Sequence, residues 1–252
     1  MLRQLKALGY DGVEFAGFYG HSAQDVRAML EECGLRAVSS HVALKLIEAD
    51  MQGVIDYHKA IGCDYIAVPY LSAEQRPGTP AFAGVLRTIY QFGCLCRDNG
   101  IQLLYHNHDF EFVSFSGMYA LDFLYAAMPE DVLKTEIDVC WVKYAGEDPA
   151  AYLRKYAGRA PVVHLKDFVG RKEGDAAPYG LLGQSETKAA GEVPFEFRPV
   201  GYGCQDVSAV VEAGLDAGAK WFVVEQDASV GRTPLEAAAM SIDTLRKIGL
   251  KG

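Results

Sequence analysis

The sequence predicts an α/β fold, a (β/α)8 TIM barrel, from three observations. Helical patterns with apolar residues at 3.6 spacing alternate with short runs rich in β-branched and aromatic residues. A glycine turn separates each helix from the run that follows it, as in "ALGYDGVEF", "AIGCDYIAV" and "DNGIQLLYH". The chain of 252 residues has the length of one such barrel, so we expect a single domain over residues 1–252.

The elements follow one another in a regular order. Amphipathic patterns predict helices that include residues 2–8, 23–33, 51–61 and 82–99. Strands are expected at seven runs: "GVEFAG" (12–17), "RAVSSHVAL" (36–44), "DYIAVPY" (64–70), "IQLLYHNHDF" (101–110), "LKTEIDVCWV" (133–142), "APVVHLKDF" (160–168) and "WFVVEQD" (221–227). Strands joined through helices form right-handed βαβ units and a parallel sheet. An open doubly wound sheet fits less well, because the early GxGxxG turn of that fold is absent.

Two places depart from the repeat. A full barrel needs a strand before the helix at 2–8, but only Met1 precedes it, so the first strand is missing from the count. Two explanations stay open: either the chain is truncated relative to a full barrel, or the gap is closed differently, for example as an open seam that a partner subunit covers. Residues 169–204 form a polar, Gly-rich stretch that is too long for an ordinary connection. Because this stretch follows the strand that carries His164, we expect it to act as a lid.

Composition excludes several classes of protein. The net charge of -9, with no basic patch, argues against a nucleic-acid partner or an anionic membrane surface. No apolar stretch reaches the roughly 18 residues of a membrane span, and the first residues do not resemble a signal peptide. The six cysteines lack CxxC spacing, which favours reduced thiols over a disulfide framework. We therefore expect a cytoplasmic protein.

Almost every expected strand ends in a group that can bind a proton or a metal ion. In a parallel barrel the carboxyl ends of the strands line the active site. In "YHNHDF" the alternation of a strand places His106 and His108 on one face, and Asn107 and Asp109 on the other. The strand-end groups are Glu14, His41, His106, His108, Asp138, His164, Lys166, Glu225 and Asp227.

Structural interpretations compete with functional ones at these positions. We interpret His21 and His58 as structural residues, in a turn and on a helix face. Asp138 could cap the turn that follows it, and Lys166 could form an ion pair with Glu225. A joint metal or catalytic role is nevertheless favoured for four of the groups, because each would otherwise need its own buried partner: His106, Asp138, His164 and Glu225.

The chain resembles the xylose isomerase-like TIM-barrel superfamily, and within it the sugar phosphate isomerase/epimerase group. The resemblance covers about residues 2–250 and rests on phrases in a family-like order: "LGYDGVEFAGF", "GLRAVSSHV", "YHNHDFEF", "EIDVCWVKYAGEDPAAYLRKYAGRAPVVHLKDF", "PVGYG" and "FVVEQD". "PVGYG" departs from the Gly-Glu-Gly of many relatives, and the family's usual opening strand is absent.

The resemblance implies a metal site. Ketose epimerases of this superfamily hold one divalent ion, commonly Mn2+, through Glu, Asp, His and Glu. By position the last three correspond to Asp138, His164 and Glu225, and the first glutamate is replaced by His106. The active-site histidine of related dehydratases corresponds to His108. We expect one divalent ion on these four ligands, Mn2+ first, with Zn2+, Co2+, Fe2+ or Mg2+ as alternatives.

The implied chemistry is α-proton transfer through an enediolate that the ion stabilises. His108 or Glu225 could serve as the base, and Lys166 could bind an oxyanion or a hydroxyl group. Substrate contacts are expected from Glu14, His41 and Trp141. The resulting prediction is a divalent-metal-dependent isomerase or epimerase of a sugar or sugar phosphate.

Three alternatives remain at this stage. A lyase or dehydratase acting on a keto-sugar, keto-glycoside or keto-inositol would use the same metal site. A non-catalytic carbohydrate-binding subunit would explain both the missing strand and the replaced ligand. An endonuclease IV-like nuclease would need more metal ligands and a surface that attracts DNA, which the acidic composition disfavours. The sequence also leaves a homo-oligomer possible.

Overall fold

The computed structural model describes residues 1–170 and 194–250, and its centre is a curled sheet of seven parallel strands. These strands are β1 (Gly12–Phe15), β2 (Arg36–Ser40), β3 (Tyr65–Val68), β4 (Gln102–His106), β7 (Lys134–Asp138), β8 (Val162–Leu165) and β11 (Trp221–Val224). Five of them pair in the order β11-β8-β7-β4-β3, and β1 pairs with β2. A bridge between His41 and Ala67 joins β2 to β3. The fold is an incomplete (β/α)8 barrel, as the sequence predicted.

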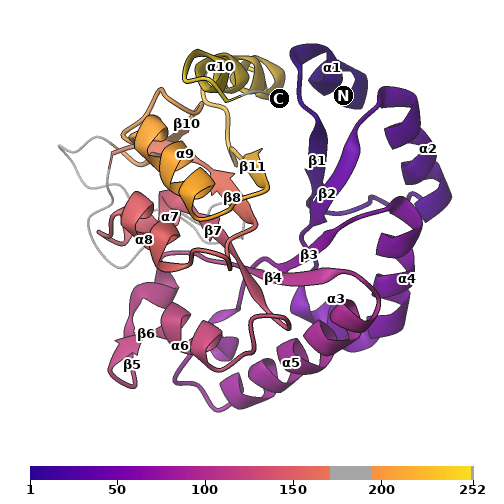
Figure 1. The fold of residues 1–252 in the computed structure, drawn as a ribbon, viewed down its shortest axis with the longest axis vertical. Coiled ribbons are helices and arrows are strands. Elements are labelled where there is room, and N and C mark those ends of the chain that lie inside the picture. Colours follow the sequence, from indigo (N-terminus) through magenta and orange to yellow (C-terminus); the bar gives the residue numbers. More distant parts are fainter. Residues whose placement is uncertain (171–193, 251–252) are drawn as a thin grey trace.

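Helices cover the outer face of this sheet (Figure 1). They are α1 (Leu2–Leu8), α2 (Ala23–Cys33), α3 (Leu44–Ala49), α4 (Met51–Ile61), α5 (Phe82–Asp98), α6 (Ala120–Ala126), α7 (Val139–Tyr144), α8 (Pro149–Lys155), α9 (Val207–Asp216) and α10 (Pro234–Lys247). Two 3₁₀ turns span Ala73–Gln75 and Phe110–Phe112, and two short antiparallel pairs consist of β5 (Ser114–Phe115) with β6 (Met118–Tyr119), and β9 (Asp167–Val169) with β10 (Glu196–Arg198). The four helices predicted from the sequence are present.

Local signals in the sequence fix the helix ends. Ser22 caps α2 and forms a reciprocal capping box with Asp25, which satisfies backbone N–H groups of the first turn. Gly34 and Gly62 follow α2 and α4 with φ of 66° and 69°. Glycine reaches this left-handed conformation without steric cost, so the chain turns directly into the next strand.

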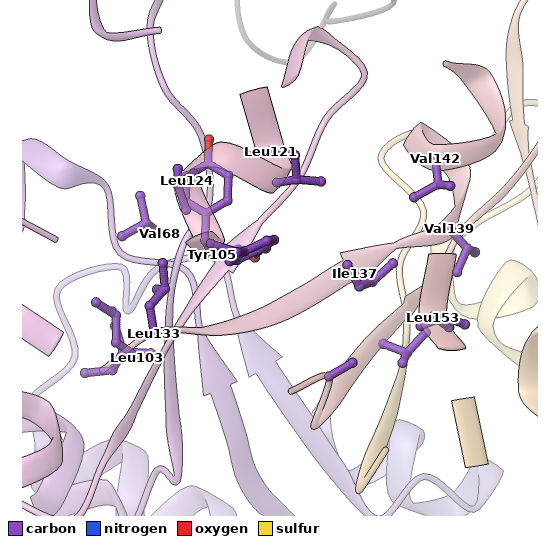
Figure 2. Packing of buried hydrophobic residues seen from close by; sticks show 14 of the residues in the cluster. Val68, Leu103, Tyr105, Leu121, Leu124, Leu133, Ile137, Val139, Val142 and Leu153 are labelled. Carbon is purple, nitrogen blue, oxygen red and sulfur yellow. Dashed lines mark hydrogen bonds between the residues drawn. The ribbon is translucent and has the colours of Figure 1, made fainter. Parts of the chain in front are cut away.

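The main hydrophobic core lies between the strands and the helices. Figure 2 shows part of it, with Tyr105 of β4 beside Leu121 and Leu124 of α6, and Ile137 of β7 beside Leu153 of α8. All five of these side chains are fully buried. Strands β3, β4 and β8, which lie inside the sheet, are almost fully buried and are mostly apolar, whereas every residue of β1 and β11 beside the gap is partly exposed.

All seven strands end earlier than the runs predicted from the sequence, and three of these ends bear on the site. The run expected over 101–110 leaves the sheet after His106, and that over 133–142 leaves it after Asp138. In the second case the Asp138 carboxylate accepts hydrogen bonds from the N–H groups of Cys140 and Trp141 and starts α7. The run over 160–168 divides at Lys166, because Asp167–Val169 pairs with Glu196–Arg198 instead.

The described residues contain no strand between β1 and β11, where a complete barrel would have its eighth (Figure 1). Helices α1 and α10 nevertheless meet outside this gap, where Arg246 donates a hydrogen bond to the Leu8 carbonyl and Tyr10 donates one to the Ala238 carbonyl. The described residues thus lack the strand that the sequence analysis also found missing. Most of the lid predicted over 169–204 lies outside the described residues.

None of the helices in the described ranges has the length and apolar character needed to cross a membrane.

Candidate active site and metal centre

Strand register brings four buried polar residues to one place inside the barrel. His106 of β4 is level with Glu136 of β7, and Asp138 of β7 is level with His164 of β8. Side chains of paired residues point to the same face of a sheet, and those two positions apart in one strand do so as well. The four side chains therefore converge, and each is at most 2% exposed.

One half of this site contains Glu136, which sequence reasoning missed. Its Oε2 lies 2.8 Å from His41 Nε2, 3.4 Å from His106 Nδ1 and 3.5 Å from His164 Nε2. Glu14 Oε1 lies 3.0 Å from both His41 Nε2 and His164 Nε2. Glu14 and His41, predicted as substrate contacts, thus lie against the predicted ligands.

The other half contains the remaining predicted ligands. Asp138 Oδ2 lies 3.7 Å from His106 Nε2, and Glu225 Oε2 lies 3.0 Å from His164 Nδ1. The predicted cap and the predicted ligand role of Asp138 are compatible, because Oδ1 caps α7 while Oδ2 faces the histidine. Asn107 fixes this corner by bonding both the N–H and the carbonyl of Asp138.

Two overlapping sets of donor atoms are therefore close enough to hold a metal ion. The first comprises His41, His106, Glu136 and His164, and the second is the predicted set of His106, Asp138, His164 and Glu225. His106 and His164 belong to both sets, because each imidazole presents one ring nitrogen to each side. Mixed imidazole and carboxylate donors suit a divalent ion.

The Lys166 ammonium lies beside the second set. It is 3% exposed, and its Nζ lies 2.9 Å from Glu225, 2.9 Å from Asp227 and 3.6 Å from Asp138. The rings of Trp141 and Phe197 are 5.3 and 5.1 Å away. The ion pair with Glu225 that the sequence left as an alternative is present.

An aromatic wall borders the site. His108, predicted as a base, stacks on Trp141 with ring centroids 5.3 Å apart and meets the His106 ring at 5.1 Å. Phe110 also stacks on His108, with ring centroids 5.5 Å apart. The predicted substrate contact Trp141 is 1% exposed and belongs to this wall. His21 is exposed and His58 is buried in α4, so both lie outside the site.

For each ionisable group of the site, burial disfavours the charged form and neighbouring opposite charges favour it, so the direction of the pKa shift depends on which effect is larger. Burial lowers the pKa of His106 to about 4. Burial also opposes protonation of His41, but Glu14 and Glu136 outweigh it and raise its pKa to about 9. The pKa of Asp138 rises to about 7 because burial outweighs the attraction of Lys166. The pKa of Glu136 is well below its usual value, since His164 and His41 overcome the effect of burial. Without an ion, the protonated imidazole of His41 helps to balance the charge of the carboxylates.

A cavity of about 500 Å3 opens beside the site, in the gap between β1 and β11. Apolar residues of α1, β11 and α10 line most of it, and it reaches Glu14, His41 and Glu225.

Glu136 could have been found from the sequence. The alternation that pairs His106 with His108 also places Glu136 and Asp138 of "EID" on one face. Asp227 follows Glu225 with the same spacing and also lies in the site.

Comparisons with known proteins agree with this architecture. The family model described as "Xylose isomerase-like TIM barrel" matches residues 2–248. The comparison with curated proteins gave no match. Among solved structures, a sugar phosphate isomerase/epimerase from Parabacteroides distasonis is similar with a TM-score of 0.79 and 19% identity, over 100% of this chain and 88% of that one.

Two further structures share the fold. A xylose isomerase-like TIM barrel protein from Mycobacterium smegmatis, in complex with magnesium, has a TM-score of 0.68 and 18% identity over 99% of this chain and 87% of that one. The probable 3-DHS dehydratase AsbF from Bacillus anthracis has a TM-score of 0.72 and 11% identity, over 97% of this chain and 92% of that one. Because the family model matches residues 2–248 of the 252, this chain belongs to the xylose isomerase-like TIM-barrel family.

Proposed function

We propose that the protein is a divalent-metal-dependent isomerase or epimerase of a sugar or sugar phosphate. The observation that carries the proposal is the buried cluster around His106 and His164, where carboxylates meet both ring nitrogens of each imidazole. Sugar phosphate isomerase/epimerases among the structures of similar fold support the substrate class.

The two histidines shared by both donor sets, His106 and His164, are suited to a divalent ion. His106 Nδ1 and His164 Nε2 are buried and make no hydrogen bond within the described residues. Buried polar atoms are rarely left without a partner, so these nitrogens are suited to metal ligation. When bound, the ion would act as a Lewis acid on the carbonyl of a ketose and lower the cost of forming the enediolate.

The chain's own residues supply the remaining steps. Glu225 and His108 are the proposed proton-transfer groups, since they flank the two shared imidazoles. Lys166 is proposed to hold a substrate oxygen, because its ammonium is fixed between carboxylates at the edge of the site. Trp141 and the aromatic wall exclude water from this side.

The test is hydrogen exchange at carbon. The protein, purified without chelator, is incubated with a panel of ketoses and keto-glycosides in D2O, and loss of the α-proton signal is followed by NMR. We expect metal-dependent exchange that chelation abolishes and that His164→Ala lacks. Product analysis then separates epimerisation and isomerisation from elimination, which the dehydratase of similar fold keeps as the second candidate.

An absence of exchange with every substrate, in protein that holds its ion, would contradict the proposal and favour a carbohydrate-binding subunit. The Mn2+ preference, the cytoplasmic location and a homo-oligomeric state remain predictions.

A further inference from the structure

The two donor sets cannot be equivalent, because the same two imidazoles serve both. A histidine that binds a metal ion through one nitrogen commonly has its other nitrogen held by a carboxylate. One set would then hold the ion, and the other would orient His106 and His164 from behind. Distances and the position of Lys166 distinguish the two.

Distances in the first set match a coordination shell. Ligands about 2.0–2.2 Å from an ion lie roughly 3.0–3.5 Å from each other in tetrahedral to octahedral arrangements. Glu136 Oε2 is 2.8–3.5 Å from three imidazole nitrogens, and Glu14 Oε1 is 3.0 Å from two of them. The four donor atoms of the first set all lie within 4.8 Å of one another, and Glu14 Oε1 adjoins two of them.

Hydrogen bonding is similar in the two sets. In the first, His106 Nδ1 and His164 Nε2 have no hydrogen-bond partner among the described residues, while His41 Nε2 is hydrogen-bonded to Glu136 at 2.8 Å. In the second, Asp138 Oδ2 has no such partner, while His164 Nδ1 is hydrogen-bonded to Glu225 at 3.0 Å. Each set thus offers unpartnered donor atoms to an ion, and the choice between them depends on the distances and on Lys166.

The second set already has a cation. The buried Lys166 ammonium contacts both of its carboxylates, Asp138 and Glu225. A divalent ion bound there would face a like charge at close range in a site with little water to screen it.

We propose that the ion is held by the first set extended by Glu14: the carboxylates of Glu14 and Glu136, His41 Nε2, His106 Nδ1 and His164 Nε2. Asp138, Glu225 and Lys166 then orient the imidazoles and face the substrate. Three imidazoles favour Fe2+, Co2+ or Zn2+ over Mg2+. The assignment rests on the proposed function only in requiring one bound divalent ion.

The experiment measures Co2+ affinity and stoichiometry in the parent and in single variants. His41 is a member of the first set only, so His41→Ala should weaken Co2+ binding more than about 100-fold, as should Glu136→Gln. Asp138→Asn removes an orienting group and should cost about 10- to 100-fold. His21→Ala, at an exposed histidine outside the site, is the matched control and should bind like the parent.

A second measurement requires no variant. Pulsed electron paramagnetic resonance of the Cu2+-loaded parent counts the imidazoles on the ion, and we expect three. A count of two imidazoles, or Co2+ binding that survives His41→Ala but is lost in Asp138→Asn, would overturn the ligand assignment and leave the proposed function standing. A parent that binds no ion at all would overturn the proposed function as well.

Discussion

Replacing Lys166 with methionine tests the division of the site into a metal half and a lysine half. The substitution keeps most of the apolar stem but removes the ammonium that three carboxylates share, at 2.9, 2.9 and 3.6 Å. Removing one partner of a buried ion pair costs about 3–5 kcal/mol, because the other charge is left uncompensated. The Glu225 and Asp227 side chains keep 29% and 22% exposure, so we expect the lower end, about 3 kcal/mol.

The same change should leave the number of bound ions unchanged. With the ammonium gone, Asp138 and Glu225 face His106 Nε2 and His164 Nδ1 without a competing cation. Each of these nitrogens still carries the proton of an imidazole whose other nitrogen binds the ion, so it donates to a carboxylate and cannot bind a second ion. We therefore expect Lys166→Met to bind one Co2+ ion, no more tightly than the parent, and at about 100 times the dissociation constant this ion should add about 2.7 kcal/mol of stability to either protein.

The assay is urea denaturation with and without Co2+, together with metal content by mass spectrometry. Lys247→Met, at an exposed lysine, is the control and should change neither quantity. If Lys166→Met still bound a single ion, and bound it more tightly than the parent, the ion and Lys166 would be competing for one set. That result would refute the reasoning above.

Three further changes test the fold around the site. Burial raises the pKa of Glu111 to about 7, so the folded chain holds a proton that the unfolded chain releases from about pH 4.5 upward. The free energy of unfolding should therefore fall as pH rises from 4.5 to 7. In denaturant titrations, the free energy of unfolding of Glu111→Gln relative to that of the parent should increase by about 3 kcal/mol between pH 5 and pH 8. An equal pH dependence of the two proteins would contradict this. A Cβ at Gly93 would lie 2.6 Å from Val132, whereas one at Gly84 of the same helix would meet nothing within 4 Å. Thermal unfolding should show Gly93→Ala destabilised by about 1–3 kcal/mol and Gly84→Ala stabilised by up to about 1 kcal/mol, and the reverse order would show that α5 is packed differently. Asp167 accepts hydrogen bonds from four backbone N–H groups, two on each oxygen. Asp167→Asn turns an amide toward two of those donors and should cost about 3 kcal/mol or more in urea denaturation, and a loss below about 1 kcal/mol would mean that the loop after β10 is held by other contacts.

The fold was predictable because its signals are local. Apolar strands, helix caps and the turn glycines at Gly34 and Gly62 each act within a few residues, and their repetition indicates a barrel. The strand ends at His106 and Asp138 were predicted too late. The end at Asp138 has a local signal, its cap on α7, whereas the residue after His106 is held by a long-range contact, the hydrogen bonds of Asn107 to the Asp138 backbone.

The site was predictable only in part for a similar reason. Strand-end position identified His106, Asp138, His164 and Glu225, and the structure brings them together. Glu136 was missed because it lies inside a strand, where a carboxylate looks out of place until the register puts it level with His106. The closeness of Glu14 and His41 to the metal cluster depends on the curl of the sheet, which brings β1 and β2 round to β8.

The central claim is that one divalent ion binds to His106 and His164, on the side of Glu136. Anomalous diffraction from crystals grown with Co2+ would locate the ion directly. We predict one peak within bonding distance of His106 Nδ1 and His164 Nε2, with Lys166 still paired with Glu225. A peak at the opposite nitrogens of the two rings, beside Asp138, would contradict the assignment, and no peak in this cluster would contradict the metal-dependent mechanism itself.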